Sequence, residues 1–301
     1  MKVFVTGATG YIGFSVACAF RRAGHEVWGL ARGMDKARLL TRNEICPVLG
    51  SMQDPDSFKA VAEDCSVIIH AAADFRADTA ALDRETVQTL VGCSRRGACP
   101  KTLVYTSGVW VHGNTAGKLV DETTPLAPPQ LVSWRPELER LVLGASGIKG
   151  IVIRPGCVYG RQGGLTGMWF RGASSDKNLR VVGSGNNRWA MVHVDDLADA
   201  YLRAAASGLG GEVFAITDRS RWSVRDMAAA VARAAEYEGE IRFVPLAEAA
   251  KSMGDVAECL ALDQHVDARK AVRLLGWQPR HGGFVDEVEI FFESWKAAQS
   301  D

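Results

Sequence analysis

The first thirty-two residues limit the possible folds of this chain more than any other segment. An apolar run at Val3–Val5 is followed by a turn with three glycines, Gly7, Gly10 and Gly13, then by helical spacing of apolar residues, and then by a second apolar run that ends at Arg32. This is the order of elements in a βαβ dinucleotide-binding unit. Glycines let the backbone approach a pyrophosphate, and the unpaired N–H groups that begin the next helix favour phosphate. The segment therefore predicts a dinucleotide site, with an ordinary glycine turn as the alternative.

The end of the second apolar run predicts which dinucleotide is bound. An Asp or Glu about 20 residues past the glycines suits the 2′-hydroxyl of NAD, whereas an Arg suits the 2′-phosphate of NADP. Here the run ends at Ala31 and Arg32 without an acidic residue, and Lys36 follows one helical turn later. A guanidinium pairs with phosphate through two parallel hydrogen bonds. We therefore expect NADP(H) rather than NAD(H); the alternative is that Arg32 only begins a solvated loop.

The composition excludes several classes of protein. Of the 301 residues, 47% are hydrophobic and 23% are charged, as in ordinary soluble globular proteins. Basic and acidic residues number 35 each, so no net field attracts nucleic acid or an anionic membrane. No apolar run is long enough to span a membrane, and we expect no signal peptide because the chain opens on a strand. The seven cysteines form no CxxC pair, which favours a reduced cytoplasmic protein without structural metal or disulfides.

Apolar runs alternate with helical stretches through the first half of the chain. We expect strands at 2–6, 26–31, 46–49, 66–71, 101–106 and 150–154, and helices at 11–24, 34–42, 55–63, 80–97 and 132–146. This alternation predicts an α/β fold of the Rossmann type, a doubly wound parallel sheet with helices on both faces. After about residue 155 the pattern loosens, with glycine-rich loops at 160–167 and 183–185. We expect a dinucleotide-binding domain over 1–155 and a smaller C-terminal substrate lobe over 156–301, with some of its segments returning to the sheet.

Six short motifs follow one another along the chain. They are residues 6–13 (TGATGYIG), 69–73 (IHAAA), 104–113 (VYTSGVWVHG), 154–160 (RPGCVYG), 183–198 (GSGNNRWAMVHVDDLA) and 274–279 (LLGWQP). In this order they resemble the extended short-chain dehydrogenases/reductases, often called the NAD-dependent epimerase/dehydratase family. The resemblance implies a Rossmann domain that holds the cofactor and a lobe that holds the substrate.

The glycine turn, the second strand and the resemblance together give the candidate cofactor contacts. They are Gly7, Thr9, Gly10, Tyr11, Ile12 and Gly13 of the turn, Arg32 and Lys36, Ala71, Ala72 and Ala73 after the fourth strand, Thr106, Arg135, and Pro155, Gly156 and Val158 under the nicotinamide.

The chain departs from the family pattern at the catalytic motif. The family places Tyr and Lys, spaced YxxxK, on the helix after the fifth strand. Aligned on Glu139-Arg140, Leu131 and Arg135 take these two positions, whereas aligned on the aromatic residue, Trp134 and Leu138 take them. Neither alignment supplies a phenol, and neither an indole nor a leucine can protonate an alkoxide. The chain therefore resembles an atypical member of the family that lacks the YxxxK motif.

The resemblance also implies a catalytic Ser where this chain has Gly108. Four other side chains remain as catalytic candidates: Ser107, Arg135, His112 and Asp74. Ser107 keeps a hydroxyl one residue from the usual place, and Arg135 can replace the Lys as ribose anchor and positive charge. His112 and Asp74 are the titratable groups for acid–base chemistry. The structural alternatives are that His112 fills an aromatic slot and that Asp74 caps a loop or helix.

Large side chains near the expected pocket predict an apolar substrate. The candidates are Trp110, Trp134, Tyr159, Trp169 and Arg188. An aromatic-lined pocket suits a small hydrophobic carbonyl or alkene; the alternative is that these residues only close the core of the lobe. The loop at 185–189 is more similar to the branches that resemble dihydroflavonol and sterol reductases than to those that handle nucleotide sugars.

We therefore expect an NADP(H)-dependent oxidoreductase that reduces a small hydrophobic carbonyl, enone or imine without the usual Tyr–Lys pair. Hydride delivery belongs mostly to the cofactor, so the missing phenol does not exclude reduction. Two alternatives stay open: a catalytically silent NADP(H)-binding sensor or scaffold, and a sugar-nucleotide epimerase or dehydratase. The expected partner is a small molecule rather than nucleic acid or a membrane, and the resemblance implies a homodimer as one option.

Overall fold

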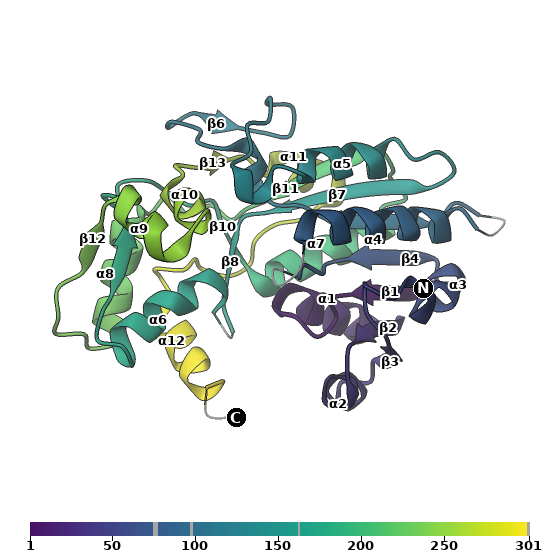
Figure 1. Cartoon of the computed structure of the whole chain (residues 1–301), viewed down its shortest axis with the longest axis horizontal. Helices are drawn as coiled ribbons and strands as arrows, with labels where there is room; N and C mark the ends of the chain where they lie inside the picture. Colours follow the sequence, from purple (N-terminus) through teal and green to yellow (C-terminus); the bar gives the residue numbers. More distant parts are fainter. Residues whose placement is uncertain (75–77, 97–98, 162, 300–301) are drawn as a thin grey trace.

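A seven-stranded parallel β-sheet forms the centre of the protein (Figure 1). The computed structural model describes residues 1–74, 78–96, 99–161 and 163–299. Across the sheet the strands lie in the order β11 (Glu212–Ile216), β7 (Lys149–Pro155), β5 (Thr102–Thr106), β4 (Val67–His70), β1 (Lys2–Thr6), β2 (Glu26–Ala31) and β3 (Cys46–Leu49), and each pairs in parallel with its neighbours. The chain order reverses between β4 and β1. Such a switch point is where sheets of this type bind ligands, beyond the carboxyl ends of the strands.

Helices cover both faces of the sheet. On one face lie α1 (Tyr11–Arg22), α2 (Met34–Arg42), α7 (Val194–Ala206) and α11 (Arg269–Leu275). On the other face lie α3 (Lys59–Asp64), α4 (Thr79–Ser94) and α5 (Arg135–Leu143). Two of these helices and β11 come from beyond residue 155, so the later part of the chain contributes to the sheet and its cover. The domain boundary at residue 155 stays a prediction.

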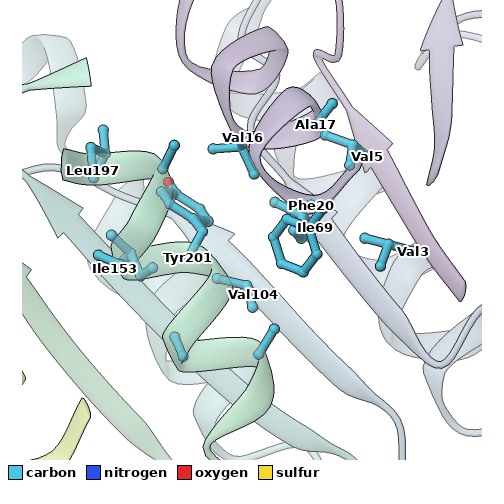
Figure 2. Close-up of a cluster of buried hydrophobic side chains, with 14 of the residues drawn as sticks. Val3, Val5, Val16, Ala17, Phe20, Ile69, Val104, Ile153, Leu197 and Tyr201 are labelled. Carbon is cyan, nitrogen blue, oxygen red and sulfur yellow. The ribbon is translucent and has the colours of Figure 1, made fainter. Parts of the chain in front are cut away.

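Alternate residues of each strand enter two separate core layers. Val3 and Val5 of β1 belong to the layer that contains α1 and α7, whereas Phe4 belongs to the opposite layer. Figure 2 shows the first layer, in which Phe20 of α1 and Tyr201 of α7 lie over the strands. Because both faces are buried, each strand reads as a nearly continuous apolar run.

The lobe has its own core of aromatic and aliphatic side chains. Its helices are α6 (Gly167–Ser174), α8 (Val224–Ala234), α9 (Leu246–Met253), α10 (Val256–Ala261) and α12 (Val288–Ala297), which lie at the left of Figure 1. Its parallel strand pairs are β8 (Cys157–Tyr159) with β10 (Met191–His193) and β9 (Arg180–Val182) with β12 (Arg242–Val244). A third pair joins β6 (Leu119–Val120) to β13 (His265–Val266). Phe170, Phe284 and Trp295 are among the buried rings of this core.

The predicted Rossmann-type sheet is confirmed, and each predicted strand matches an observed one to within one residue at either end. The predicted helices 11–24 and 80–97 end two and three residues early, at Arg22 and Ser94, and two others differ more. The predicted helix 55–63 divides into a 3-10 turn at Pro55–Ser57 and α3, and the predicted helix 132–146 begins only at Arg135. Pro136 explains that start, because proline has no N–H to donate and fits only the first turn of a helix. Residue 97 of the predicted helix 80–97, residue 162 of the loop 160–167, and residues 300–301 of the lobe lie outside the described residues.

The length and polarity of the helices bear on membrane insertion. Within the ranges that the structure describes, none combines the length and the apolar character that crossing a membrane requires.

Candidate active site

The turn between β1 and α1 lies against the segment that follows β4. Gly7 has a φ of +70°, and a Cβ there would lie 2.5 Å from the carbonyl oxygen of Ala71. A Cβ at Gly13 would overlap the carbonyl oxygen of Gly7. Both positions therefore require glycine. Gly10 is the N-cap of α1, and neither a side-chain cap from the described residues nor an acidic residue occupies the N–H groups of the first turn of this helix. The turn thus presents free N–H donors to an anion.

A cavity of about 320 Å³ opens beside this turn, at the carboxyl ends of β4, β5 and β7. The start of α1, the start of α5 and Gly164–Leu165 of the lobe complete its wall. Many sequence-predicted site residues line it: Tyr11, Ile12, Ala71, Ala72, Ala73, Thr106, Ser107, Trp110, Arg135, Pro155, Gly156 and Val158. The other cofactor candidates do not line the cavity: Gly7, Thr9 and Gly10 lie in the turn, Gly13 in the first turn of α1, Arg32 directly after β2, and Lys36 on α2. The sheet therefore brings together residues that are up to about 150 positions apart in the chain.

Two polar side chains of the cavity have buried atoms without a hydrogen-bond partner in the described residues, namely Ser107 and Arg135. Arg135, the first residue of α5, donates a hydrogen bond from Nη1 to the carbonyl oxygen of Ser107. Its Nε and the Oγ of Ser107 are buried, and neither has a hydrogen-bond partner in the described part of the chain. A buried polar atom without a partner costs about 1–3 kcal/mol. Both groups therefore fit a bound molecule that supplies the missing acceptor.

Gly108 makes room for the Arg135 guanidinium. A Cβ at position 108 would lie 3.0 Å from Nη1 of Arg135, which is closer than a carbon and a guanidinium nitrogen normally approach. The missing side chain at 108 and the arginine at 135 are thus two parts of one arrangement. Both replacements are visible in the sequence, but their contact is not, because the two residues lie on different segments.

Behind the cavity, Tyr201 forms a hydroxyl pair that the sequence analysis missed. The hydroxyl of Tyr201, on α7, lies 2.7 Å from Oγ1 of Thr106. Burial raises the pKa of Tyr201, which is fully enclosed. No local motif distinguishes this tyrosine from any other core residue of an amphipathic helix. Tyr11 is the one phenol among the described residues that line the cavity, and its hydroxyl donates to the carbonyl oxygen of Gly160 at 2.7 Å.

Arg32 and Asp74 meet as an ion pair. Nη1 of Arg32 lies 2.8 Å from Oδ2 of Asp74, and the aspartate side chain is only 10% exposed while the arginine is 59% exposed. Both residues were candidates from the sequence, Arg32 for a phosphate and Asp74 for acid–base chemistry. The structure places Asp74 against Arg32 rather than in the wall of the cavity. Lys36 is exposed on α2.

His112 lies outside the cavity, behind a buried arginine. Its Nε2 is 3.3 Å from Nη1 of Arg154, which pairs with both carboxylate oxygens of Glu139 at 3.0 and 2.5 Å. Burial and the charge of Arg154 lower the pKa of His112 to about 4. The imidazole is therefore neutral near pH 7. This placement matches the structural alternative, in which His112 fills a core slot.

Trp134 also points away from the cavity, toward a buried carboxylate that the sequence analysis missed. Its Nε1 donates to Oδ2 of Asp83 on α4 at 2.9 Å. The same carboxyl group accepts from the hydroxyl of Tyr105 at 2.9 Å and pairs with Nε2 of His70 at 2.7 Å. Burial alone would raise the pKa of Asp83, but these three partners outweigh it and lower the pKa. Nδ1 of His70 in turn contacts the hydroxyl of Thr6 at 2.6 Å.

Among the five substrate candidates, Trp110 lines the cavity and the other four do not. Trp169 stacks on Trp189 in the core of the lobe, with ring centroids 4.8 Å apart. The hydroxyl of Tyr159 is buried against Asp218 at 3.0 Å. Arg188 is exposed and lies beside His265. The aromatic side chains of the lobe therefore mainly build its core.

The sheet with its switch point, the glycine turn and the adjoining cavity define a dinucleotide-binding Rossmann protein of the extended short-chain dehydrogenase/reductase type. The model described as the NAD dependent epimerase/dehydratase family matches residues 3–217, and the chain belongs to this family. Its cofactor is a nicotinamide dinucleotide. The glycine cradle and the uncapped start of α1 fit such a group.

Known proteins similar to this chain cover almost its full length. A ketoreductase of Stigmatella aurantiaca that acts on a 4-hydroxy-2-methyl-3-oxo-4-farnesyl-3,4-dihydroquinoline-1-oxide is 28% identical over 92% of this chain and 87% of its own. A UDP-glucose 4-epimerase of Mycolicibacterium smegmatis is 26% identical over 97% of this chain and 98% of its own. The crystal structure of a dTDP-glucose 4,6-dehydratase from Bacillus anthracis in complex with NAD superposes with a TM-score of 0.84, at 19% identity, over 100% of this chain and 98% of that one. That last likeness shows the fold alone.

Proposed function

We propose that the protein is an NADP(H)-dependent oxidoreductase that reduces a small hydrophobic carbonyl, enone or imine. The observation that carries this proposal is the pair of unpartnered groups, the Ser107 hydroxyl and the Arg135 guanidinium, in one cavity beside the glycine turn. The bound cofactor supplies the hydride. The chain itself binds, orients and stabilises the acceptor.

Ser107 and Arg135 would hold the oxygen or nitrogen of the acceptor. A hydroxyl and a guanidinium both donate hydrogen bonds, and fixed donors in a partly dry cavity stabilise the negative charge that develops as the acceptor takes up hydride. Val109, Trp110, Val132 and Leu165 give the cavity an apolar wall. Such a wall favours a hydrophobic acceptor and limits the entry of water.

The end of β2 supports NADP(H) rather than NAD(H). Arg32 is the exposed cation at this position, and its guanidinium can pair with a 2′-phosphate. Its partner Asp74 holds the side chain in place before the cofactor binds. A phosphate would share Arg32 with this carboxylate, and Lys36 on the next helix would add positive charge.

The placement of Arg188 argues against a sugar-nucleotide substrate in this cavity. A diphosphate needs basic groups, and Arg188, the candidate for that role, lies on a separate surface beside His265. The similarity to a ketoreductase supports reduction of a carbonyl compound. A silent sensor would bind cofactor in the same cradle but would turn over no acceptor, so activity distinguishes the two.

The cofactor preference is tested by reversing the charge at Arg32. Arg32→Glu should weaken NADPH binding at least about tenfold, because a charge-assisted hydrogen bond contributes about 1.5–3 kcal/mol. NADH binding should change less than about twofold, since NADH lacks the 2′-phosphate. Arg42→Glu, an equal charge change in the last turn of α2, is the control and should leave both dissociation constants unchanged. Equal affinity of the Arg32 variant and the wild type for NADPH would contradict the proposed preference.

The reductase activity is tested by NADPH oxidation against aldehydes, ketones, enones and imines. Turnover of at least one class, lowered by Arg135→Ala and by Ser107→Ala, is the expected result. Tight NADPH binding without turnover of any class would favour the sensor.

A further inference from the structure

The proton donors of the cavity decide which hydride acceptors it can reduce. A simple ketone that accepts hydride becomes an alkoxide, a strong base whose formation needs a proton from a positioned acid. An acceptor whose product anion is delocalised needs no such acid. The groups in the cavity that can donate a proton therefore limit the class of substrate that it can reduce.

Most groups of the cavity wall that could donate a proton are already hydrogen-bonded within the protein or are buried in a core. The Tyr11 hydroxyl donates to the Gly160 carbonyl oxygen, and burial raises the pKa of this phenol. Burial raises the pKa of the Cys157 thiol to about 12, and this side chain packs in the core of the lobe. The Thr106 hydroxyl pairs with that of Tyr201, and the Tyr201 side chain is fully buried in the core between the sheet and α7.

Ser107 and Arg135 are the donors that remain among the described hydroxyl, thiol and guanidinium groups of the wall. An arginine keeps its proton in proteins, and the buried Ser107 hydroxyl has no hydrogen-bond partner in the described residues that could pass it a proton. These two groups can therefore stabilise an oxyanion by hydrogen bonding and charge, but they do not neutralise it. The cavity is suited to form an anion and to keep it as one.

We infer that the acceptor is an α,β-unsaturated ketone or aldehyde, reduced at its carbon–carbon double bond. This inference rests on the proposed reductase function and names its substrate class. The β-carbon accepts the hydride, the π electrons of the double bond move to form a new double bond between the α-carbon and the carbonyl carbon, and the carbonyl oxygen takes the negative charge. Arg135 and Ser107 hold this enolate oxygen. The α-carbon then takes a proton from water, so NADPH and one proton are consumed for each saturated carbonyl formed.

A matched pair of ring compounds tests the inference. 2-Cyclohexenone and cyclohexanone have the same ring and the same carbonyl group and differ only in the double bond. With NADPH and the 301-residue chain, we expect the enone to turn over at least about 100-fold faster, because reduction of a ketone without a general acid loses a rate factor of about 10²–10⁴. Cyclohexanone should accumulate as the product, and in D₂O it should carry one solvent deuterium on the α-carbon.

Variants on α5 connect the result to the site. Arg135→Ala should lower kcat/KM for the enone by at least about tenfold, because a charged hydrogen bond to the oxyanion is lost. Arg135→Lys should retain more of the activity, since it keeps the positive charge. Arg140→Ala, an exposed arginine on the same helix, is the control and should match the wild type.

The possible outcomes separate this inference from the proposed function. Reduction of cyclohexanone at a rate similar to the enone, or conversion of the enone to the allylic alcohol, would overturn the inference and leave the reductase function standing. NADPH binding without oxidation by any acceptor would overturn both.

Discussion

At the scale of single residues, the site is built on compensating replacements. Gly108 stands where the resemblance implies a serine, and Arg135 stands at the position of the lysine. The longer, branched guanidinium occupies the space that a side chain at 108 would fill, and it contacts the Ser107 backbone from there. Changing either residue alone should therefore disturb the other.

The first prediction follows from this contact. Gly108→Ser should displace the Arg135 guanidinium and weaken NADPH binding by about fivefold or more, while the melting temperature stays nearly constant because the displaced atom ends a flexible side chain. The double variant Gly108→Ser/Arg135→Lys should recover part of the affinity, giving a coupling free energy of about 0.5–3 kcal/mol in a double-mutant cycle. Gly92→Ala is the matched control, since a Cβ there meets no atom within 4 Å. Strictly additive effects of the two substitutions would show that the contact does not govern binding.

At the scale of elements, a buried carboxylate joins the cofactor side of the sheet to the helices on one face. The carboxylate of Asp83, on α4, has three hydrogen-bond partners. They are His70 at the end of β4, Tyr105 on β5, and Trp134 directly before α5. Trp134 immediately precedes Arg135 in the chain. The carboxylate of Asp83 thus fixes the end of α5 that carries the cavity's guanidinium.

The second prediction concerns this carboxylate. Asp83→Asn should lower the free energy of unfolding by about 2–4 kcal/mol, because hydrogen bonds to a charged group contribute about 1.5–3 kcal/mol each and the amide leaves at least one donor unsatisfied. Asp78→Asn is the same substitution at the N-cap of α4 and should change the free energy by less than about 0.5 kcal/mol, since Asn and Asp cap equally well. Urea denaturation of both variants measures the difference. Similar losses in the two variants would contradict a special role for Asp83.

The same elements explain how much could be predicted from the sequence. The strands and the glycine turn are local patterns, and the parallel sheet then brings Ala71, Ser107 and Pro155 to one edge without further information. The partners of the side chains are not local. The sequence predicts that Trp134 lines the pocket, whereas in the structure its indole N–H donates to Asp83, 51 positions earlier in the chain. Tyr201 pairs with Thr106 across 95 positions, and nothing near either residue indicates the contact.

At the scale of the whole molecule, buried titratable groups make the stability depend on pH. Burial, together with Arg154, lowers the pKa of His112 to about 4 from an ordinary 6.5. Burial also lowers the pKa of His193, which is stacked on His281 with ring centroids 3.5 Å apart. Burial acts in the opposite direction on Asp218, whose pKa it raises to about 6 from 3.8. The two histidines and the aspartate therefore oppose one another on acidification.

The last prediction works out these signs. Between pH 6.5 and 4, His112 is protonated in the unfolded chain but not in the folded chain. This difference destabilises the folded state progressively as the pH falls, by up to about 3 kcal/mol. The free energy of unfolding of the wild type minus that of His112→Asn should therefore decrease by up to this amount from pH 7 to pH 4. Between pH 6 and 3.8 the folded chain instead binds the extra proton at Asp218. The same difference taken with Asp218→Asn should accordingly increase on acidification. Chemical denaturation at several pH values measures both, and slopes of the same sign in the two variants would contradict the assignment.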